Sequence, residues 1–104
     1  MGMDAFQALA EPQRRRVVEI VVRRGQLSAS QICDEFDVTP QAISQHLRVL
    51  REARVLQMEK SAQKRLYSFD PRSMHQIQAW MDDMTRQWTH RLDRLERVLK
   101  EEEE

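Results

Sequence analysis

The stretch from Ser28 to Ala53 constrains the fold most, because it holds two helix start signals close together. Ser28 and Gln31 have the spacing of a capping box, in which each side chain bonds a backbone N–H at the helix start. Thr39 followed by Pro40 is the second signal, since Thr caps helices and Pro suits the first helical position. The sequence therefore predicts a short helix, a turn and a longer helix that ends near Ala53, which is the helix-turn-helix layout.

Helices and a hairpin are expected on either side of this pair. Residues 4–10 predict a short helix, and Pro12 opens another whose end is marked by Gly25. Residues 55–60 and 65–69 alternate apolar and polar side chains, which predicts two strands of a β-hairpin. A hairpin that directly follows a helix-turn-helix is a wing.

The last third of the chain has no glycine, and its one proline, Pro71, follows the capping residue Asp70. One helix is expected from 71 to about 100, with residues 101–104 as a solvated tail. At about 1.5 Å per residue such a helix is about 45 Å long, which is more than one small domain covers. Its apolar stripe therefore predicts pairing with a second copy, as in a coiled coil. The stripe consists of Met74, Ile77, Met81, Met84, Trp88, Leu92, Leu95 and Leu99.

Charge is unevenly distributed, although the chain has 17 basic and 17 acidic residues and no net charge. Residues 38–67 contain six basic and two acidic residues, which gives this stretch a net charge of +4. Bulk charge therefore does not favour nucleic-acid binding, but a local basic patch does. The single cysteine excludes an intrachain disulfide. Because no signal peptide or bilayer-spanning apolar run is present, we expect a cytoplasmic protein with no membrane partner.

The longer helix of the pair is expected to present a polar face opposite its apolar stripe. Glutamine pairs bidentately with adenine in the major groove, and recognition helices place their N-terminal residues on bases. Basic residues in the hairpin would reach phosphates or an adjacent minor groove. The expected contacts to double-stranded DNA are Thr39, Gln41, Ser44, Gln45, Arg48 and Arg51 on the helix, and Lys60, Lys64 and Arg65 in the hairpin. A second basic group at residues 14–16 and 23–24 is interpreted as ordinary surface, with backbone contact as the alternative.

Two other classes of function compete with DNA binding. A winged-helix protein-interaction module that binds no DNA is compatible with the zero net charge and the acidic tail. Such a module would show no salt-dependent DNA binding, so this observation distinguishes it from a DNA-binding regulator. An enzyme is not expected, since the chain lacks a Gly-rich phosphate loop and a Ser/His/Asp set at a strand–turn–helix.

The chain resembles the ArsR/SmtB winged-helix repressors over roughly residues 4–100. The resemblance is carried by the run Ser44-Gln45-His46-Leu47-Arg48, followed by Leu50-Arg51-Glu52-Ala53 and then Leu66-Tyr67. It implies a homodimer that binds operator DNA and represses transcription. One departure is Arg54, which stands where the family commonly has a glycine in Ala-Gly-Leu.

The fold expected from pattern and resemblance together is mainly α with a minor β component. It is a winged helix-turn-helix with about five helices, a two-stranded β-hairpin wing and a long C-terminal dimerisation helix. Residues 1–104 would form a single domain, with a DNA-binding core at 12–70 and dimerisation helices at 3–10 and 71–100. The resemblance assigns the dimer interface to the first and last helices, at Phe6, Leu9, Met74, Ile77, Met81, Met84, Trp88, Leu92 and Leu95.

Many members of that family sense metals, which makes the ligand positions informative. The best-known signature is a Cys-x-Cys pair, and the matching positions here are Ser28 and Ser30, whose hydroxyls are poor ligands for soft metals. His90 and Asp93 echo half of a second family site, whose other half would fall on two residues that cannot coordinate. We therefore expect no metal and no cofactor, and assign no small-molecule effector.

Two single residues are interpreted as structural. Cys33 has no partner thiol and is interpreted as a small buried or half-buried residue, with a reactive thiol as the alternative. His46 flanks the apolar stripe of the longer helix and is interpreted as a packing or hydrogen-bonding residue.

Overall fold

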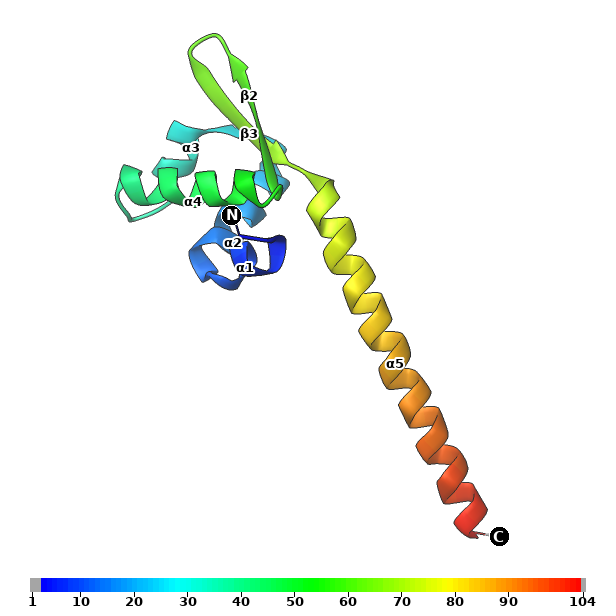
Figure 1. The fold of residues 1–104 in the computed structure, drawn as a ribbon. Coiled ribbons are helices and arrows are strands. Elements are labelled where there is room, and N and C mark those ends of the chain that lie inside the picture. The colour runs from blue at the N-terminus through cyan, green and yellow to red at the C-terminus, as the bar shows by residue number, and fades with distance from the viewer. Residues whose placement is uncertain (1–2, 104) are drawn as a thin grey trace. The chain divides into compact units, whose positions relative to one another are not determined.

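The computed structural model describes residues 3–103, which contain five helices and three strands (Figure 1). The predicted mainly α fold, with a hairpin wing and a long C-terminal helix, is confirmed. Two compact units are present, one up to Met74 and one from His75. In chain order the elements are α1 (Ala5–Ala10), α2 (Pro12–Arg24), β1 (Gln26–Ser28), α3 (Ala29–Asp34), α4 (Pro40–Glu52), β2 (Leu56–Ser61), β3 (Lys64–Phe69) and α5 (Pro71–Glu103).

The helix starts predicted from the sequence are confirmed. Ser28 Oγ accepts the backbone N–H of Gln31 at 3.2 Å, and the Gln31 side chain accepts the backbone N–H of Ser28 at 2.9 Å. At the start of α4, Thr39 Oγ1 accepts the backbone N–H of Ala42 at 3.1 Å. Gly25 follows the end of α2 with a φ of 84°, a conformation that disfavours a side chain.

One apolar core holds the unit up to Met74 together. Its largest fully buried side chains come from α2, α3, α4, β2 and the residue before β2. Full burial of such a side chain contributes about 1.5–3 kcal/mol of hydrophobic stabilisation. They are Val17, Val21, Ile32, Ile43, Leu47, Leu50, Val55 and Leu56. Because α4 contributes three of them from one face, its opposite face is left for solvent or a partner.

The wing belongs to a three-stranded antiparallel sheet in the order β1-β3-β2. The sequence predicted the β2–β3 hairpin but not β1, because three residues are too few to show an alternating pattern. The hairpin turn is tight, since Ser61 pairs with Lys64 across only two residues. In Figure 1 the hairpin extends beyond the helices of this unit.

The end of α4 is joined to the start of α5 by a buried polar cluster. Asp70, only 2% exposed, accepts the backbone N–H of Arg72 at 3.1 Å and its guanidinium at 2.7–3.2 Å. The Oγ of Ser73 shares its one proton between the carbonyl oxygens of Ala53 and Arg54, at 2.6 and 2.7 Å. The Arg72 guanidinium lowers the pKa of Asp70, so this carboxylate stays charged in its buried place.

The unit from His75 is a single helix, the remainder of α5. The sequence predicted a helix end near 100 and a solvated tail, but α5 continues to Glu103. Glutamate has high helix propensity, which accounts for the extension. The last residue of the expected tail, Glu104, lies outside the described residues. Within residues 3–103, no helix combines the length and apolarity needed to cross a membrane.

Candidate nucleic-acid interface

The outward face of α4 carries polar side chains that make no hydrogen bond within the described residues. Gln41, Ser44 and Gln45 are exposed, and none bonds another group between residues 3 and 103. Together with Pro40 and Arg48 they line one shallow hollow on the surface. The structure therefore brings four of the predicted DNA-binding residues together on one patch.

Arg48 differs from its neighbours because it has an intramolecular partner. Its Nε lies 3.6 Å from the carboxylate of Glu52, one helical turn further along α4. Both side chains are more than half exposed, so the pair contributes little stability and restrains the guanidinium only weakly. With Arg51 they line a second small hollow. The sequence analysis did not pair Glu52 with Arg48, although their spacing is that of a helical ion pair.

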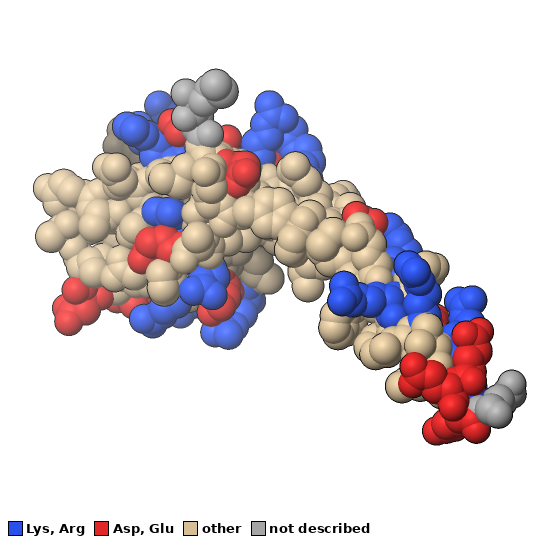
Figure 2. All heavy atoms as spheres, turned by 60° about the horizontal axis from the view of Figure 1, so that its bottom comes forward, with Lys and Arg blue, Asp and Glu red and all other residues tan. Residues whose placement is uncertain are grey.

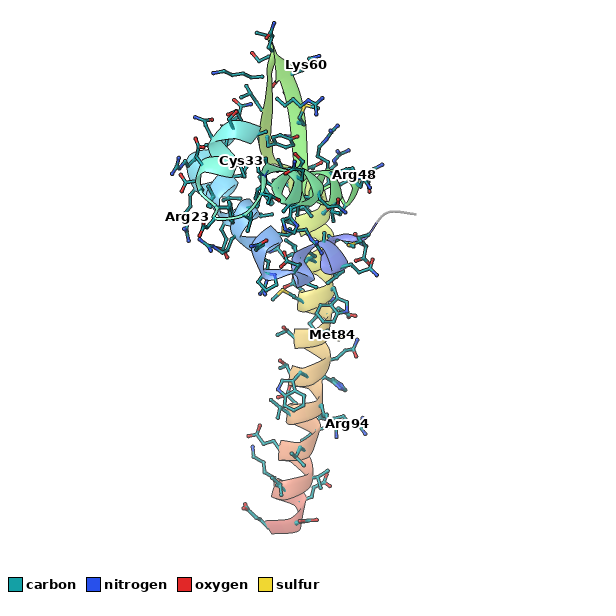
Figure 3. All side chains as sticks on the ribbon, turned by 90° about the vertical axis from the view of Figure 1, so that its left-hand side faces the viewer. Arg23, Cys33, Arg48, Lys60, Met84 and Arg94 are labelled. Carbon is teal, nitrogen blue, oxygen red and sulfur yellow. The ribbon has the colours of Figure 1, made fainter. Side chains whose placement is uncertain are left out.

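The three predicted wing residues carry positive charges at the far end of the hairpin. Lys60 is directly opposite Arg65 in the antiparallel register, and Lys64 is opposite Ser61. All are exposed, and no acidic partner is found for them within residues 3–103. Figure 3 labels Lys60 near the end of the hairpin and Arg48 on α4. Like charges directly opposite each other destabilise a sheet, so this pairing suits an anion more than it suits the free hairpin.

Thr39 has a role of its own. Its hydroxyl oxygen caps α4 as described above, while the residue remains exposed. The hydroxyl proton is left for a further acceptor. The cap and a phosphate contact are therefore compatible on the same side chain.

His46 fixes the inner side of α4 to the start of α2. Its Nε2 lies 3.1 Å from the side-chain oxygen of Gln13 and 3.9 Å from the carboxylate of Glu11. The interpretation of His46 as a hydrogen-bonding residue is confirmed. Burial raises the pKa of Glu11, but the backbone N–H groups of Arg14 and Gln13 and the nearby His46 outweigh it, so the net shift is downward. Gln13 was missed, because nothing in the sequence links two residues so far apart.

The second basic group has mainly structural contacts. Arg14 donates from Nε to the carbonyl oxygen of Ala8 at 2.6 Å, which ties α2 to α1. Arg24 forms an ion pair with Glu35, and the Arg16 guanidinium lies 5.3 Å from the centre of the Phe36 ring. These contacts agree with the interpretation of the group as ordinary surface.

The apolar stripe of α5 has nothing to pack against within its own unit. Met81, Trp88 and Leu95 are 57%, 60% and 55% exposed. Of the other predicted interface residues, Phe6, Met84 and Leu92 are also exposed, while Leu9, Met74 and Ile77 are half-buried. Figure 2 shows basic side chains along α5 and a cluster of acidic side chains at its C-terminal end. A continuous apolar stripe of this length on one helix is typical of a protein–protein contact.

The candidate metal ligands are not brought together. Among residues 3–103, no group of three or more His, Cys, Asp or Glu side chains has the proximity to hold a metal ion. Ser28, at one of the family's cysteine positions, uses its hydroxyl as a helix cap. Cys33 is half-buried, in line with its interpretation.

Comparison with known proteins gives a consistent set of relatives. A family model described as a helix-turn-helix domain matches residues 9–59. The HTH-type transcriptional regulator Rv2034 of Mycobacterium tuberculosis is 34% identical over 88 residues, which cover 85% of this chain and 78% of the relative. The transcriptional repressor SdpR of Bacillus subtilis is 27% identical over 78 residues, which cover 75% of this chain and 86% of the relative.

Solved structures give the same result for the fold. A crystal structure titled as a possible transcriptional regulator for arsenical resistance superposes with a TM-score of 0.71 and 35% identity, covering 79% of this chain and 84% of that one. An ArsR-like transcriptional regulator from Rhodococcus sp. RHA1 has a TM-score of 0.77 at 22% identity, covering 89% of this chain and 87% of that one. At this identity the second comparison supports the fold alone.

Proposed function

This chain belongs to the ArsR family of winged helix-turn-helix transcriptional regulators, and we propose its function from that premise. We propose that it is a homodimeric repressor that binds an inverted-repeat operator and needs no metal to do so. As a member of the family it is a DNA-binding transcriptional regulator. That it has no enzymatic activity is part of the proposal. Dimerism, repression, the type of operator and metal independence are what we propose.

The observation that carries the proposal is the unpaired polar face of α4 beside a hairpin with opposed cations. Gln41, Ser44 and Gln45 would contact base edges, because they are exposed and make no hydrogen bond within residues 3–103. Thr39, Arg48 and Arg51 would contact the backbone on either side. Lys60, Lys64 and Arg65 would bind phosphates or enter the adjacent minor groove.

The homodimer is supported by the apolar side chains that α5 leaves exposed within its unit. In this proposal residues 1–104 form a single domain with its DNA-binding core at 12–70. Helices 3–10 and 71–100 bind the second copy, through the stripe on α5 and through Phe6 and Leu9. A two-fold dimer places its recognition helices about 34 Å apart, or a multiple of that, and therefore selects an inverted repeat.

Metal independence is supported by the side chains at the expected ligand positions. Ser28 and Ser30 offer hydroxyls where a soft metal needs thiolates. The Ser28 hydroxyl is already bonded to the backbone N–H of Gln31. We propose that the chain uses no cofactor, and that regulation of DNA binding does not depend on a metal.

Selection from a pool of random DNA duplexes tests the proposal. The full chain is incubated with the pool at two salt concentrations, bound duplexes are sequenced, and the mass of the complex is measured by sedimentation. An enriched inverted repeat bound by two chains is the expected result. Weak, sequence-blind binding that disappears with salt would contradict it, and would favour the protein-interaction module instead. Addition of a chelator is expected to leave the affinity unchanged.

A further inference from the structure

We infer that Gln41 and Gln45 each recognise an adenine in the major groove, so that the core of each half-site contains two A·T pairs. This inference rests on the proposed function, because it requires α4 to enter the groove. It goes further by assigning the bases and the two side chains that select them.

The hydrogen-bonding groups of adenine and glutamine match. In the major groove adenine presents the acceptor N7 next to the donor N6–H, and the glutamine amide presents one donor and one acceptor side by side. Guanine presents two acceptors, N7 and O6, so a glutamine satisfies only one of them while a forked cation satisfies both. Two glutamines at the reading positions therefore favour A·T over G·C pairs.

Both side chains are available in the right place. Gln41 and Gln45 lie in the N-terminal half of α4, on the same exposed hollow, and neither side chain makes a hydrogen bond within residues 3–103. Four residues of helix span about 6 Å, and base pairs stack about 3.4 Å apart. The two recognised adenines should thus lie less than about two base-pair steps apart, on either strand.

Among the described residues that line this hollow, Arg48 is the one cation, and it lies in the C-terminal half of α4. Its Nε is 3.6 Å from the carboxylate of Glu52, one turn further toward the C-terminal end. Arg51 lies still further along the helix. Both are placed for phosphates rather than for the bases that face the N-terminal half of α4.

Removal of single atoms from the DNA tests the inference. In the selected operator, each adenine is replaced in turn by 7-deazaadenine, which keeps the N6 amine and the pairing with thymine but lacks N7. Binding of the wild-type chain and of Gln41→Ala, Gln45→Ala and the control Gln26→Ala is measured by fluorescence anisotropy. Gln26 is exposed on β1, its side chain makes no hydrogen bond within residues 3–103, and it lies outside the α4 hollow.

In each glutamine variant, the affinity should no longer depend on the N7 atom of one particular adenine. For the wild-type chain, replacing either recognised adenine should weaken binding roughly 5- to 150-fold. Gln41→Ala should abolish that effect at one adenine and Gln45→Ala at the other, while Gln26→Ala should change neither. Unchanged sensitivity in both variants, or a selected half-site without A·T pairs at its core, would overturn the inference and leave the proposed function standing. Failure to enrich any sequence would overturn the proposed function, and this inference with it.

Discussion

Helices α4 and α5 are both amphipathic, but the apolar side is buried in α4 and largely exposed in α5. The apolar side of α4 is buried in the core of its unit through Ile43, Leu47 and Leu50. Along most of α5 the apolar side chains are exposed, and Ser73 is its one buried residue. A stripe of similar spacing thus holds a helix within its own unit in one case and is left uncovered in the other.

The difference indicates which partner each helix fits. Because the apolar side of α4 is buried in the core, its exposed side carries hydrogen-bonding and positively charged groups, which match a DNA groove. In contrast, α5 offers apolar area, which matches another apolar stripe. The two surfaces should therefore respond to different substitutions. Charge on the α5 stripe should abolish self-association, and loss of positive charge on the proposed DNA-binding surface should weaken DNA binding without changing self-association.

The largest effect is expected from Leu95→Glu on the α5 stripe. Burying a leucine in the contact is worth about 1.5–3 kcal/mol, it is lost twice in a symmetric dimer, and the new charges would have to be desolvated. The dimer dissociation constant should rise about 100-fold or more, and specific DNA binding should fall with it. Sedimentation equilibrium measures the first quantity and fluorescence anisotropy the second.

Ala79→Glu is the matched control for that substitution. It introduces the same charge on α5, but at an exposed position on the side away from the stripe. The variant should remain dimeric and bind DNA as the wild-type chain does. A dimeric Leu95→Glu variant would show that the stripe is not the interface.

A smaller loss is expected from Asp70→Asn, at the junction between the two helices. Asparagine still caps a helix, so the substitution removes mainly the charge that bonds Arg72. Because the Arg72 guanidinium is mostly exposed, the free energy of unfolding at neutral pH should fall by only about 1 kcal/mol. Urea titrations followed by circular dichroism measure it. Asp37→Asn, at an exposed carboxylate without a hydrogen bond within residues 3–103, is the control.

The stability difference between the wild-type chain and Asp70→Asn should also depend on pH. The pKa of Asp70 is lowered in the folded state by its hydrogen bonds to Arg72. The ionised carboxylate therefore contributes its full stability above the pKa that it has in the unfolded chain, and loses it as the pH falls through its lower pKa in the folded state. The two unfolding curves should converge on acidification. A constant gap down to low pH would contradict the charged pair as its cause.

Removing one cation from the wing should weaken DNA binding but stabilise the free protein. Lys60→Ala should weaken binding to all DNA sequences and reduce the slope of log affinity against log salt by about 0.9, because one phosphate contact is lost. It should also stabilise the free protein by about 0.2–1 kcal/mol, since Lys60 faces Arg65 directly.

Lys64→Ala is the matched variant for the wing, because Lys64 faces Ser61 and not another cation. It should reduce the salt slope by a similar amount and leave the stability unchanged. If both variants keep the wild-type salt slope, the wing does not bind phosphates. If both change stability equally, the opposed charges are not the reason.

Local signals allowed most of the fold to be predicted from the sequence, and long-range contacts account for what was missed. The caps at Ser28 and Thr39 and the periodicity of α4 and α5 are encoded within a few residues. The third strand, β1, exists only because β3 pairs with it, so three residues alone carried no signal. The contact between His46 and Gln13 likewise depends on the packing of α4 on α2.

The candidate site could be predicted as a set of residues but not as an arrangement. Helical spacing was enough to place Gln41, Ser44 and Gln45 on one exposed face. The opposition of Lys60 and Arg65 required the hairpin register, which no glycine at the turn marks. The restraint of Arg48 by Glu52 was readable from their spacing and had not been considered.

Arg54, which connects α4 to the wing, should affect the free energy of unfolding alone. It has a φ of 61°, a left-handed conformation that costs a residue with a side chain about 1–2 kcal/mol. Glycine adopts this conformation freely but has more entropy to lose on folding, so Arg54→Gly should raise the free energy of unfolding by only about 0.5–1 kcal/mol.

Gly25→Ala is the reciprocal test at the end of α2, where φ is 84° and an added Cβ would meet no atom within 4 Å. Strain alone should then destabilise that variant by about 1–3 kcal/mol. Because the proposed DNA-binding face of α4 and the stripe of α5 are untouched, both variants should keep the wild-type DNA affinity and dimer mass. An Arg54→Gly variant less stable than the wild type would show that contacts of the arginine outweigh its backbone strain.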